Sequence, residues 1–374
     1  MRAGLAADLV VVGLGPAGAS AALAAASGGL RVIGLDRRRE AGLPVQCAEF
    51  VPGPLLGQAS GLPEAIRQPI SAMHTYLAGE APCLTADFRG QMIDRAAFDQ
   101  ALVSAAVDAG AQVRFGASVK AITPEGVVLQ NGEILDAPVL IGADGPRSLL
   151  GLAIGAGAQA LVETRQITVP LHEPHAATDI FLSPDYRGGY AWLFPKGAVA
   201  HIGLGVEPAL RHQLKGLLEA LHAALVATGR VGREIMNLTG GAIPVGGLRR
   251  CTGMAQGRSI LLAGDAAGLT NPVTGAGIAS AVQSGRMAGE ATVRLAQGHT
   301  QAVSDYALDL DDIFGVSLAR AVARRTHLMA KPTADVRAQP QHLRQGWIAY
   351  PEYWAPLTID GTRQNFSHNE RALP

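Results

Sequence analysis

Cysteine and lysine are scarce in this sequence of 374 residues. The three cysteines, Cys47, Cys83 and Cys251, are widely spaced and form no CxxC or zinc-binding pattern. This spacing favours a reducing compartment and a fold without structural disulfides, and we expect no metal site. Only four of the 31 cationic residues are lysine, which we interpret as a bias of genomic base composition.

Basic blocks and long apolar runs are missing as well. The 31 Lys and Arg residues balance the 31 Asp and Glu residues and gather in no block, so nucleic acid is not expected as a partner. Gly, Pro and charged residues interrupt the apolar runs, so we expect no transmembrane helix. The first strand-like run begins at Leu9, which leaves no room for a signal peptide. We therefore predict a cytoplasmic protein of two closely joined domains, with contact to a membrane surface left open.

A glycine-rich segment near the N-terminus predicts a dinucleotide-binding unit. Leu9–Val12 is a short β-branched run, typical of a strand buried on both faces. A GxGxxG pattern, an Ala-rich helical stretch and a second apolar run, Val32–Leu35, follow in that order. A glycine pattern alone is a weak signal, but here the strand, the helix and the second strand accompany it.

Each part of this unit has a physical task in holding a pyrophosphate. Gly13 permits a tight turn, Gly15 lets the pyrophosphate approach the backbone, and Gly18 lets helix and strand pack closely. The helix N-terminus offers free N–H groups and the positive end of its dipole. Asp36 ends the second strand at the spacing of a carboxylate that hydrogen-bonds ribose hydroxyls, and Arg37 is a candidate for lining the adenosine pocket.

A loop with three prolines follows, over residues 42–57, and its prolines exclude a regular helix. Cys47 lies in the middle of this loop, with Glu49 beside it. A lone cysteine is usually buried and inert, whereas this one comes directly after the cofactor motif. A packing role and a role in the site therefore both stay open.

The next part of the chain predicts several strands around one helix. Strands are expected at 70–76, 82–88, 113–115, 118–122, 127–129, 134–135 and 139–141, and an amphipathic helix at 96–109. The last strand ends in Gly142-Ala-Asp144-Gly145. We find no packing reason for a carboxylate there, so Asp144 is interpreted as a second clamp near the dinucleotide.

Residues 161–205 alternate between apolar and polar residues, which predicts a β-rich insert with strands at 166–171, 179–182, 190–194 and 199–206. Tyr190, Trp192 and Phe194 alternate within it, so their side chains point to one face of a strand. That face is either ordinary core or the wall of a substrate cavity. A helix is predicted over 208–229 and an irregular segment over 239–244.

A second glycine-rich unit begins after a buried strand at 259–263. It contains Gly264, Asp265, Gly275 and Gly277 and leads into a helix predicted over 277–297. An acid and several glycines in this order suit backbone contact with a polyphosphate or a flat ring. Residues 300–330 are predicted to be helical, and the tail that contains Trp347, Tyr350, Tyr353 and Trp354 is expected to lie over the body of the protein.

Four of these motifs, in this order, resemble the FAD-binding set of the p-hydroxybenzoate hydroxylase superfamily. They are GLGPAGA at Gly13–Ala19, DRAAFD at Asp94–Asp99, GADG at Gly142–Gly145 and the block Gly264–Gly277. Within that superfamily, three further segments resemble the geranylgeranyl reductase family: Gly189–Gly197, the Cys47 loop and Gly240–Pro244. Members of this family follow the cysteine with glycine, whereas this chain has Ala48, so the loop on the substrate side differs.

The resemblance implies a mixed α/β fold with a Rossmann-type FAD-binding domain, an inserted β-rich substrate domain and a C-terminal helical segment. The expected FAD-binding domain is 1–70, 92–160 and 250–298, the substrate domain is 71–91 and 161–249, and the C-terminal part is 299–374. Non-covalent FAD and an electron donor, NAD(P)H or another reductant, are implied.

The resemblance also implies roles for individual residues. The FAD-binding set is Gly13, Gly15, Ala17, Gly18, Asp36, Arg37, Arg95, Asp144, Gly264, Asp265, Gly275, Gly277 and Ile278. Within it, Arg95 would contact the diphosphate side, Asp265 would hold the ribityl chain or the pyrophosphate, and the backbone of Gly275–Ile278 would face the isoalloxazine. Tyr190, Trp192 and Phe194 would line the substrate cavity, with Cys47 as the catalytic residue across the flavin.

Four functions remain at this point. The leading one is an FAD-dependent reductase of isoprenoid carbon–carbon double bonds, and the alternative is an NAD(P)H- and O2-dependent monooxygenase that hydroxylates an aromatic ring such as tryptophan or phenol, free or on a peptide. A flavin halogenase would need a lysine near the cavity, and none occurs before Lys120. A flavin-binding electron-transfer partner fits less well, because the insert is large enough to line a cavity. The expected substrate is thus an apolar or aromatic small molecule, borne on a lipid or a peptide in some of these cases.

Overall fold

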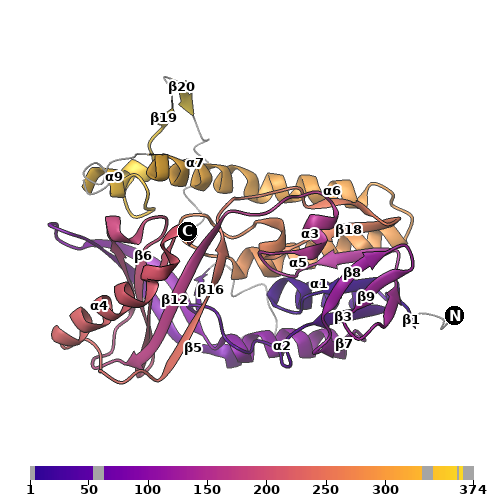
Figure 1. Cartoon of the computed structure of the whole chain (residues 1–374), viewed down its shortest axis with the longest axis horizontal. Helices are drawn as coiled ribbons and strands as arrows, with labels where there is room; N and C mark the ends of the chain where they lie inside the picture. Colours follow the sequence, from indigo (N-terminus) through magenta and orange to yellow (C-terminus); the bar gives the residue numbers. More distant parts are fainter. Residues whose placement is uncertain (1–4, 54–62, 331–339, 360–361, 365–374) are drawn as a thin grey trace.

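The computed structural model describes residues 5–53, 63–330, 340–359 and 362–364. Figure 1 shows two lobes side by side, one built on a mostly parallel sheet and one on a long antiparallel sheet, with C-terminal helices extending along both. This arrangement confirms the predicted mixed α/β fold with a nucleotide-binding part and a β-rich part. No helix in the described ranges is long and apolar enough to cross a membrane.

The first lobe contains a six-stranded sheet in the order β17-β18-β11-β2-β3-β7. Its strands are β2 (Leu9–Val12), β3 (Val32–Asp36), β7 (Gln112–Phe115), β11 (Val139–Gly142), β17 (Thr252–Ala255) and β18 (Arg258–Leu262). All pairs are parallel except β17 with β18. The chain adds β3 and β7 on one side of β2 and later β11 and β18 on the other. Ligands of open α/β sheets bind where the strand order reverses in this way, at the carboxyl end of such strands.

Two helices pack closely against each other in this lobe, α1 (Pro16–Ser27) and α5 (Ile278–Ala296). A methyl group added to Gly285 would lie 2.0 Å from the Ala17 carbonyl oxygen, and one added to Gly289 would lie 2.5 Å from that of Ala21. The glycines therefore allow backbone-to-backbone contact. A third helix, α2 (Arg95–Asp108), begins where Asp94 Oδ1 accepts a hydrogen bond of 3.0 Å from the Ala97 N–H.

A small sheet and a short helix complete the first lobe. The sheet has the order β1-β10-β9-β8 and shares the core of β2 and α1. Its strands are β1 (Leu5–Ala6), β8 (Val119–Thr123), β9 (Gly126–Leu129) and β10 (Ile134–Asp136). The short helix α3 (Leu149–Ala153) and strand β17 were not among the elements predicted from the sequence.

The second lobe is an eight-stranded sheet in the order β16-β12-β15-β14-β13-β5-β6-β4. Its strands are β4 (Phe50–Pro52), β5 (Ile66–Leu77), β6 (Cys83–Ile93), β12 (Leu161–Pro170), β13 (Ala177–Leu182), β14 (Ala191–Lys196), β15 (Val199–Val206) and β16 (Asn237–Pro244). Helix α4 (Leu214–Ala227) packs on one face through Leu218, Leu221 and Leu225. The opposite face carries Trp192 and Phe194. Because β4 and the first part of β5 join this sheet, it begins earlier in the chain than residue 71; the domain boundaries themselves stay a prediction.

Two local predictions were wrong. The segment at 239–244 is not irregular but lies within β16, which pairs with β12 along its whole length. Its glycines indicated a loop, yet a methyl group added to Gly240 would lie 2.5 Å from the Thr164 carbonyl oxygen, so glycine permits the close approach of the two strands. The helix predicted over 208–229 begins instead with a 3-10 turn, Pro208–Gln213, before α4.

The C-terminal part covers both lobes (Figure 1). It contains α6 (Ala302–Leu310), a π-helical turn (Asp311–Gly315), α7 (Val316–Ala330), the short helices α9 (Pro340–Arg344) and α10 (Pro351–Trp354), and strands β19 (Leu357–Ile359) and β20 (Thr362–Gln364). Trp347 and Tyr350 are buried against the Trp192 face of the large sheet. The expectation that the aromatic tail lies over the body is confirmed for these residues.

Candidate functional site

The first glycine-rich turn brings the backbone close together and leaves the start of α1 open. Gly13 has φ of 94°, and a methyl group on it would lie 2.2 Å from the Ala143 carbonyl oxygen. A methyl group on Gly18 would lie 1.7 Å from the Gly13 carbonyl oxygen. Gly15, in contrast, faces open space, where a methyl group would have no other heavy atom of the described chain within 4 Å. Helix α1 starts at Pro16 with no side-chain cap from the described residues, so its N-terminal N–H groups are available to an anion.

Asp36 fixes the shape of this turn. Its Oδ2 accepts the Leu14 N–H at 2.8 Å and its Oδ1 accepts the Arg38 N–H at 2.8 Å. The side chain is almost buried, so one carboxylate holds both the glycine turn and the end of β3. Each oxygen keeps a second lone pair with which to accept a ribose hydroxyl. Arg37 is exposed next to it.

Asp144 has a structural task that the sequence did not reveal. Its Oδ2 accepts the N–H groups of Leu149 at 2.7 Å and Leu150 at 3.3 Å, and its Oδ1 accepts the Ser148 hydroxyl at 2.5 Å. The carboxylate therefore stabilises the N-terminus of α3. The expectation that packing gives no reason for an acid here was wrong. The residue still lies beside the cofactor turn, because the Gly13 backbone touches Ala143.

Asp265 lies at the second glycine-rich unit, where its Oδ1 accepts a 2.6 Å hydrogen bond from the Thr270 hydroxyl. Burial raises the pKa of Asp265, although Thr270 and the charge of Arg95 act against the shift. A half-buried carboxylate with acceptor capacity to spare suits the hydroxyl groups of a ribityl chain. A methyl group on Gly277 would lie 2.6 Å from the Thr270 hydroxyl, so the backbone passes close to this acid.

Helix α5 starts directly after the loop that contains Gly275 and Gly277. Gly277 precedes its first residue, Ile278, and no described side chain caps this end. Gly275 has φ of 72°, which favours glycine. The N–H groups at this end of α5 thus remain available to a ligand that lies between Asp265 and the aromatic strand. Of the other two predicted contacts, Gly264 donates its N–H to the Ser284 hydroxyl at 3.0 Å, and Ala17 packs against α5.

Arg95 lies near both the Cys47 loop and Asp265 of the second glycine-rich unit. Its guanidinium forms two hydrogen bonds to the fully buried Asp99, of 2.8 and 3.0 Å. Burial lowers the pKa of Arg95, but the neighbouring Asp99 and Cys47 outweigh it and raise that pKa. The same cation acts on Asp265. A fixed positive charge therefore lies between Cys47 and Asp265.

Hydrogen bonds join the Cys47 loop to the aromatic strand. The Gln166 side chain donates to the Cys47 carbonyl at 3.1 Å and accepts from the Trp192 indole N–H at 3.0 Å. The Thr239 hydroxyl on β16 donates to the Val45 carbonyl at 2.7 Å. Segments that are far apart in the sequence thus form one wall.

The predicted aromatic residues share one face, as expected. Trp192 and Phe194 are 7 % exposed and belong to one apolar cluster with Tyr190. The Tyr190 hydroxyl donates to the Thr274 carbonyl at 2.5 Å, which brings it to the Gly275 loop. Its ring also contacts Trp347, with centroids 4.7 Å apart. The sequence did not predict this contact of the C-terminal part.

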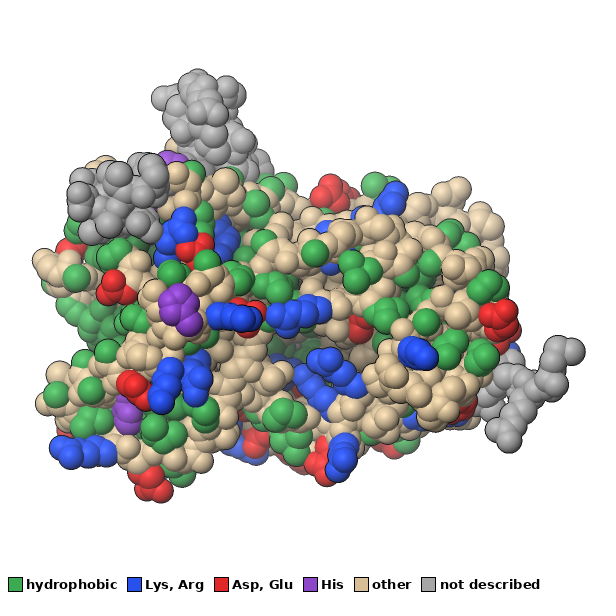
Figure 2. All heavy atoms as spheres, in the orientation of Figure 1, with side chains coloured by type: hydrophobic (Ala, Val, Ile, Leu, Met, Phe, Trp, Pro, Cys, Tyr) green, Lys and Arg blue, Asp and Glu red, His purple; other side chains and the backbone are tan. Residues whose placement is uncertain are grey.

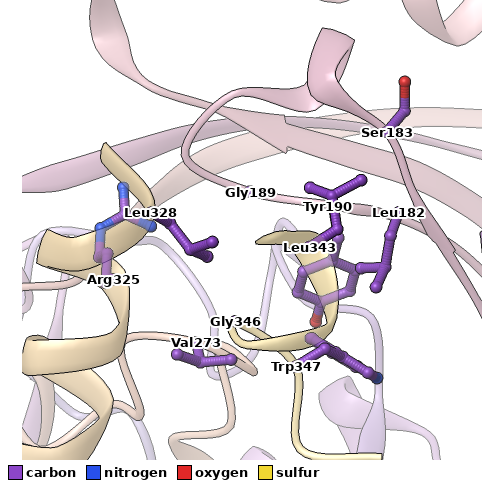
Figure 3. Close-up of a pocket in the computed structure, with 10 residues that line it drawn as sticks. All are labelled: Leu182, Ser183, Gly189, Tyr190, Val273, Arg325, Leu328, Leu343, Gly346 and Trp347. Atoms are coloured by element: carbon purple, nitrogen blue, oxygen red, sulfur yellow. The ribbon is translucent and has the colours of Figure 1, made fainter. Parts of the chain in front are cut away.

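A small pocket opens next to these rings between the large sheet and the C-terminal helices (Figure 3). Its wall is mostly apolar with one cation, and consists of Leu182, Ser183, Gly189, Tyr190, Val273, Arg325, Leu328, Leu343, Gly346 and Trp347. Arg325 lines it from α7 and donates to the Gly188 carbonyl, and burial lowers the pKa of this side chain to about 10. In the space-filling view the surface is hollowed between the lobes, with Lys and Arg side chains around the hollow (Figure 2).

Three residues of the site region were missed as a group: Glu49, Lys196 and His201. Glu49 Oε2 accepts from Lys196 Nζ at 2.6 Å and is 2.6 Å from His201 Nε2. Lys196 belongs to the motif at Gly189–Gly197, which was a signal for it, whereas His201 lies in an apolar strand without one. Lys196 is thus paired with a carboxylate.

Outside this region, His74, His175 and Asp179 meet on the large sheet, with ligand atoms within 4.8 Å of one another. Asp179 Oδ1 lies 3.1 Å from His74 Nδ1 and from His175 Nε2. Arg230 also binds this carboxylate. The Arg230 guanidinium already offsets the negative charge of Asp179. We therefore interpret the group as an ion pair rather than a metal site.

Comparison with known proteins places these motifs in a family. No family model matches the chain. A digeranylgeranylglycerophospholipid reductase of Methanopyrus kandleri is 35 % identical over 76 % of this chain and 76 % of its own length. The protein of that name from Methanothrix thermoacetophila is 34 % identical, with the same coverage of both chains. The chain belongs to the digeranylgeranylglycerophospholipid reductase family. Membership in this reductase family makes it an enzyme, an FAD-dependent oxidoreductase, and confirms the resemblance seen in the motifs.

Solved structures agree with this family. A geranylgeranyl bacteriochlorophyll reductase-like protein from Thermoplasma acidophilum has a TM-score of 0.78 and 25 % identity, over 90 % of both chains. A probable FAD-dependent monooxygenase from Pseudomonas aeruginosa has a TM-score of 0.68 and 17 % identity, over 89 % of this chain and 98 % of its own. At that identity the second likeness shows the fold alone. The reductase family therefore has the stronger support.

Proposed function

We propose that the protein saturates carbon–carbon double bonds in the isoprenoid chains of a lipid such as a digeranylgeranylglycerophospholipid. The observation that best supports this proposal is the single wall formed by the Cys47 loop, Gln166 and Trp192. This wall lies beside the uncapped start of α5. The wall is aromatic and apolar on the side that would receive a hydrocarbon chain. The names of the relatives supply the lipid class, and the geometry supports a reaction at an apolar carbon.

The chain's own residues divide the binding of FAD among them. The turn with Gly13, Gly15 and Gly18 would take the diphosphate, Asp36 the adenosine ribose and Asp265 the ribityl hydroxyls. When bound and reduced, FAD would supply a hydride from the ring atom N5 and carry negative charge near N1 and C2=O, on the far side of the ring. The N–H groups of Gly277 and Ile278 would lie at that side and stabilise the charge.

The substrate would lie on the side of the flavin ring that is opposite to Gly277 and Ile278. Trp192 and Phe194 exclude water and hold an isoprenoid chain by apolar contact. The Cys47 sulfur would lie next to the reacting double bond and give its proton to the carbon that does not receive the hydride. The electron donor that re-reduces the cofactor is NAD(P)H or another reductant. A peripheral approach to a membrane fits a lipid substrate.

The test is an anaerobic single-turnover reaction. Purified holoprotein is reduced with dithionite and mixed with digeranylgeranylglycerophospholipid in detergent, and products are analysed by mass spectrometry. We expect reoxidation of the flavin and products heavier by two hydrogens per reduced bond. Failure to reduce this lipid, free geranylgeranyl diphosphate or geranylgeraniol, together with a C4a-hydroperoxide absorbance on mixing with oxygen, would instead support the monooxygenase alternative.

A further inference from the structure

Glu49 has a backbone conformation that is unusual for its residue type. Its φ is 64°, in the left-handed region that disfavours residues with a Cβ atom. In this conformation its N–H points at the Cys47 sulfur, at 3.2 Å, and its carbonyl accepts the Ile93 N–H at 2.8 Å. A strained residue persists only where its surroundings determine it strongly, and such residues gather at functional sites.

The contacts of the Glu49 side chain hold this strained backbone conformation in place. It is buried, with Oε1 accepting the Arg95 N–H at 2.8 Å and Oε2 bonded to Lys196 and His201. These contacts come from three elements: α2, β14 and β15. Burial raises the pKa of Glu49, but the hydrogen bonds from His201, Arg95 and Lys196 outweigh it and lower that pKa. The carboxylate is therefore charged and held from three directions.

The protons of this group can be placed by its hydrogen bonds. A carboxylate only accepts, so His201 Nε2 donates to Glu49, as Lys196 Nζ does. His201 Nδ1 lies 3.1 Å from the Thr168 hydroxyl oxygen. The group thus anchors the residues that follow Cys47.

We propose that Glu49 is a positioning residue for Cys47: its anchored side chain forces the backbone conformation that holds the sulfur between the Glu49 N–H and Arg95. The proposal deepens the proposed function, on which it rests for the role of Cys47 in the reaction. Arg95 takes part twice, because its N–H binds the Glu49 carboxylate while its guanidinium lies against the sulfur. Both partners act on the same sulfur, so the reactivity of Cys47 depends on the backbone conformation that Glu49 sets.

Reactivity of Cys47 tests this without a substrate. Purified FAD-bound protein is treated with iodoacetamide across a series of neutral and alkaline pH values, and modification of each cysteine is followed by peptide mass spectrometry. Glu49→Gln removes the charge and places an amide against the donors of Lys196 and His201. We expect the alkylation profile of Cys47 to move to higher pH, with a rate at neutral pH about tenfold lower, since the thiolate is the reacting form. Lys196→Arg should preserve the wild-type profile and Lys196→Met should shift it as Glu49→Gln does.

Asp179→Asn is the matched control. Asp179 is also a buried carboxylate of the large sheet with three basic partners, but its contacts are with His74, His175 and Arg230 rather than with the Cys47 loop. It should lower the melting temperature and leave the alkylation profile of Cys47 unchanged. The proposal is overturned if Glu49→Gln lowers the melting temperature without moving the profile, or if both variants move it equally. If Glu49→Gln does not fold, Lys196→Met decides by the same criteria.

The two hypotheses fail separately. A shifted alkylation profile in a protein that reduces no isoprenoid would support the positioning role and refute the proposed substrate. An unshifted profile in a protein that does reduce isoprenoids would refute the positioning role alone.

Discussion

Replacing Gly15 by alanine should weaken FAD binding strongly while changing the stability of the apoprotein little. Gly15 has φ of −71°, which alanine adopts freely, and no heavy atom of the described protein lies within 4 Å of the new methyl group. The folded state therefore loses only the N-cap preference for glycine over alanine, about 0.5–1 kcal/mol. The space that the methyl group enters is the space in front of the α1 N-terminus.

A diphosphate displaced from these N–H groups loses charge-assisted hydrogen bonds. Each is worth about 1.5–3 kcal/mol, so losing one weakens binding roughly 10- to 100-fold. FAD titration of the apoprotein, followed by flavin fluorescence quenching, measures this change, and thermal unfolding measures stability. Gly216→Ala is a matched control, because Gly216 also faces open space but lies in α4 on the other lobe. It should leave FAD affinity unchanged. Unchanged FAD affinity in Gly15→Ala would refute the assignment of the Gly13–Gly18 turn to the diphosphate.

Further predictions concern the acids, the cysteine and the aromatic wall. Asp265→Ala should give folded protein with little FAD, and a normal flavin content would contradict its role. Cys47→Ala should retain FAD and lose roughly 10²–10⁴-fold in turnover, as for a lost general acid, whereas an inert packing cysteine would change the melting temperature and not the rate. Trp192→Ala should alter substrate affinity or product pattern more than flavin content, measured by product analysis. The pKa values of Glu49 and Asp179 are lowered in the folded state, so their stabilisation is complete above the ordinary carboxylic pKa range and is lost as pH falls through the lowered values. The fall in melting temperature with acid should therefore be shallower in Glu49→Gln than in wild type, and an equal slope would contradict this.

The sequence predicted the cofactor lobe well because its signals are local. The turn at Gly13–Gly18 and the unit at Gly264–Gly277 each need only neighbouring residues to be recognised, and the flanking strands appeared where expected. Asp144 shows the limit of such reasoning, because the cap of α3 depended on a short helix that carried no signal of its own.

Contacts between distant segments could not be predicted. Glu49 meets Lys196 and His201 only because β14 and β15 lie beside the Cys47 loop in the folded protein, and no pattern in the sequence encodes that pairing. Trp347 reaches Tyr190 in the same way, through a C-terminal part whose spacing indicated no regular element. The wrong assignment at 239–244 had another cause: glycines are frequent in turns, but here they allow two strands to approach.

The glycine-mediated contact between α1 and α5 has a consequence for ligand choice. In the proposed binding mode, one helix presents its N-terminus to the diphosphate and the other to the flavin ring, and backbone contact at Gly285 and Gly289 holds the two helices together. The separation of the two anchoring points is therefore set by the fold, so a ligand gains both only if its own length matches that separation. A flavin mononucleotide lacks the adenylate half and would reach only one of these points in the proposed binding mode, so we expect the protein to bind the dinucleotide more tightly.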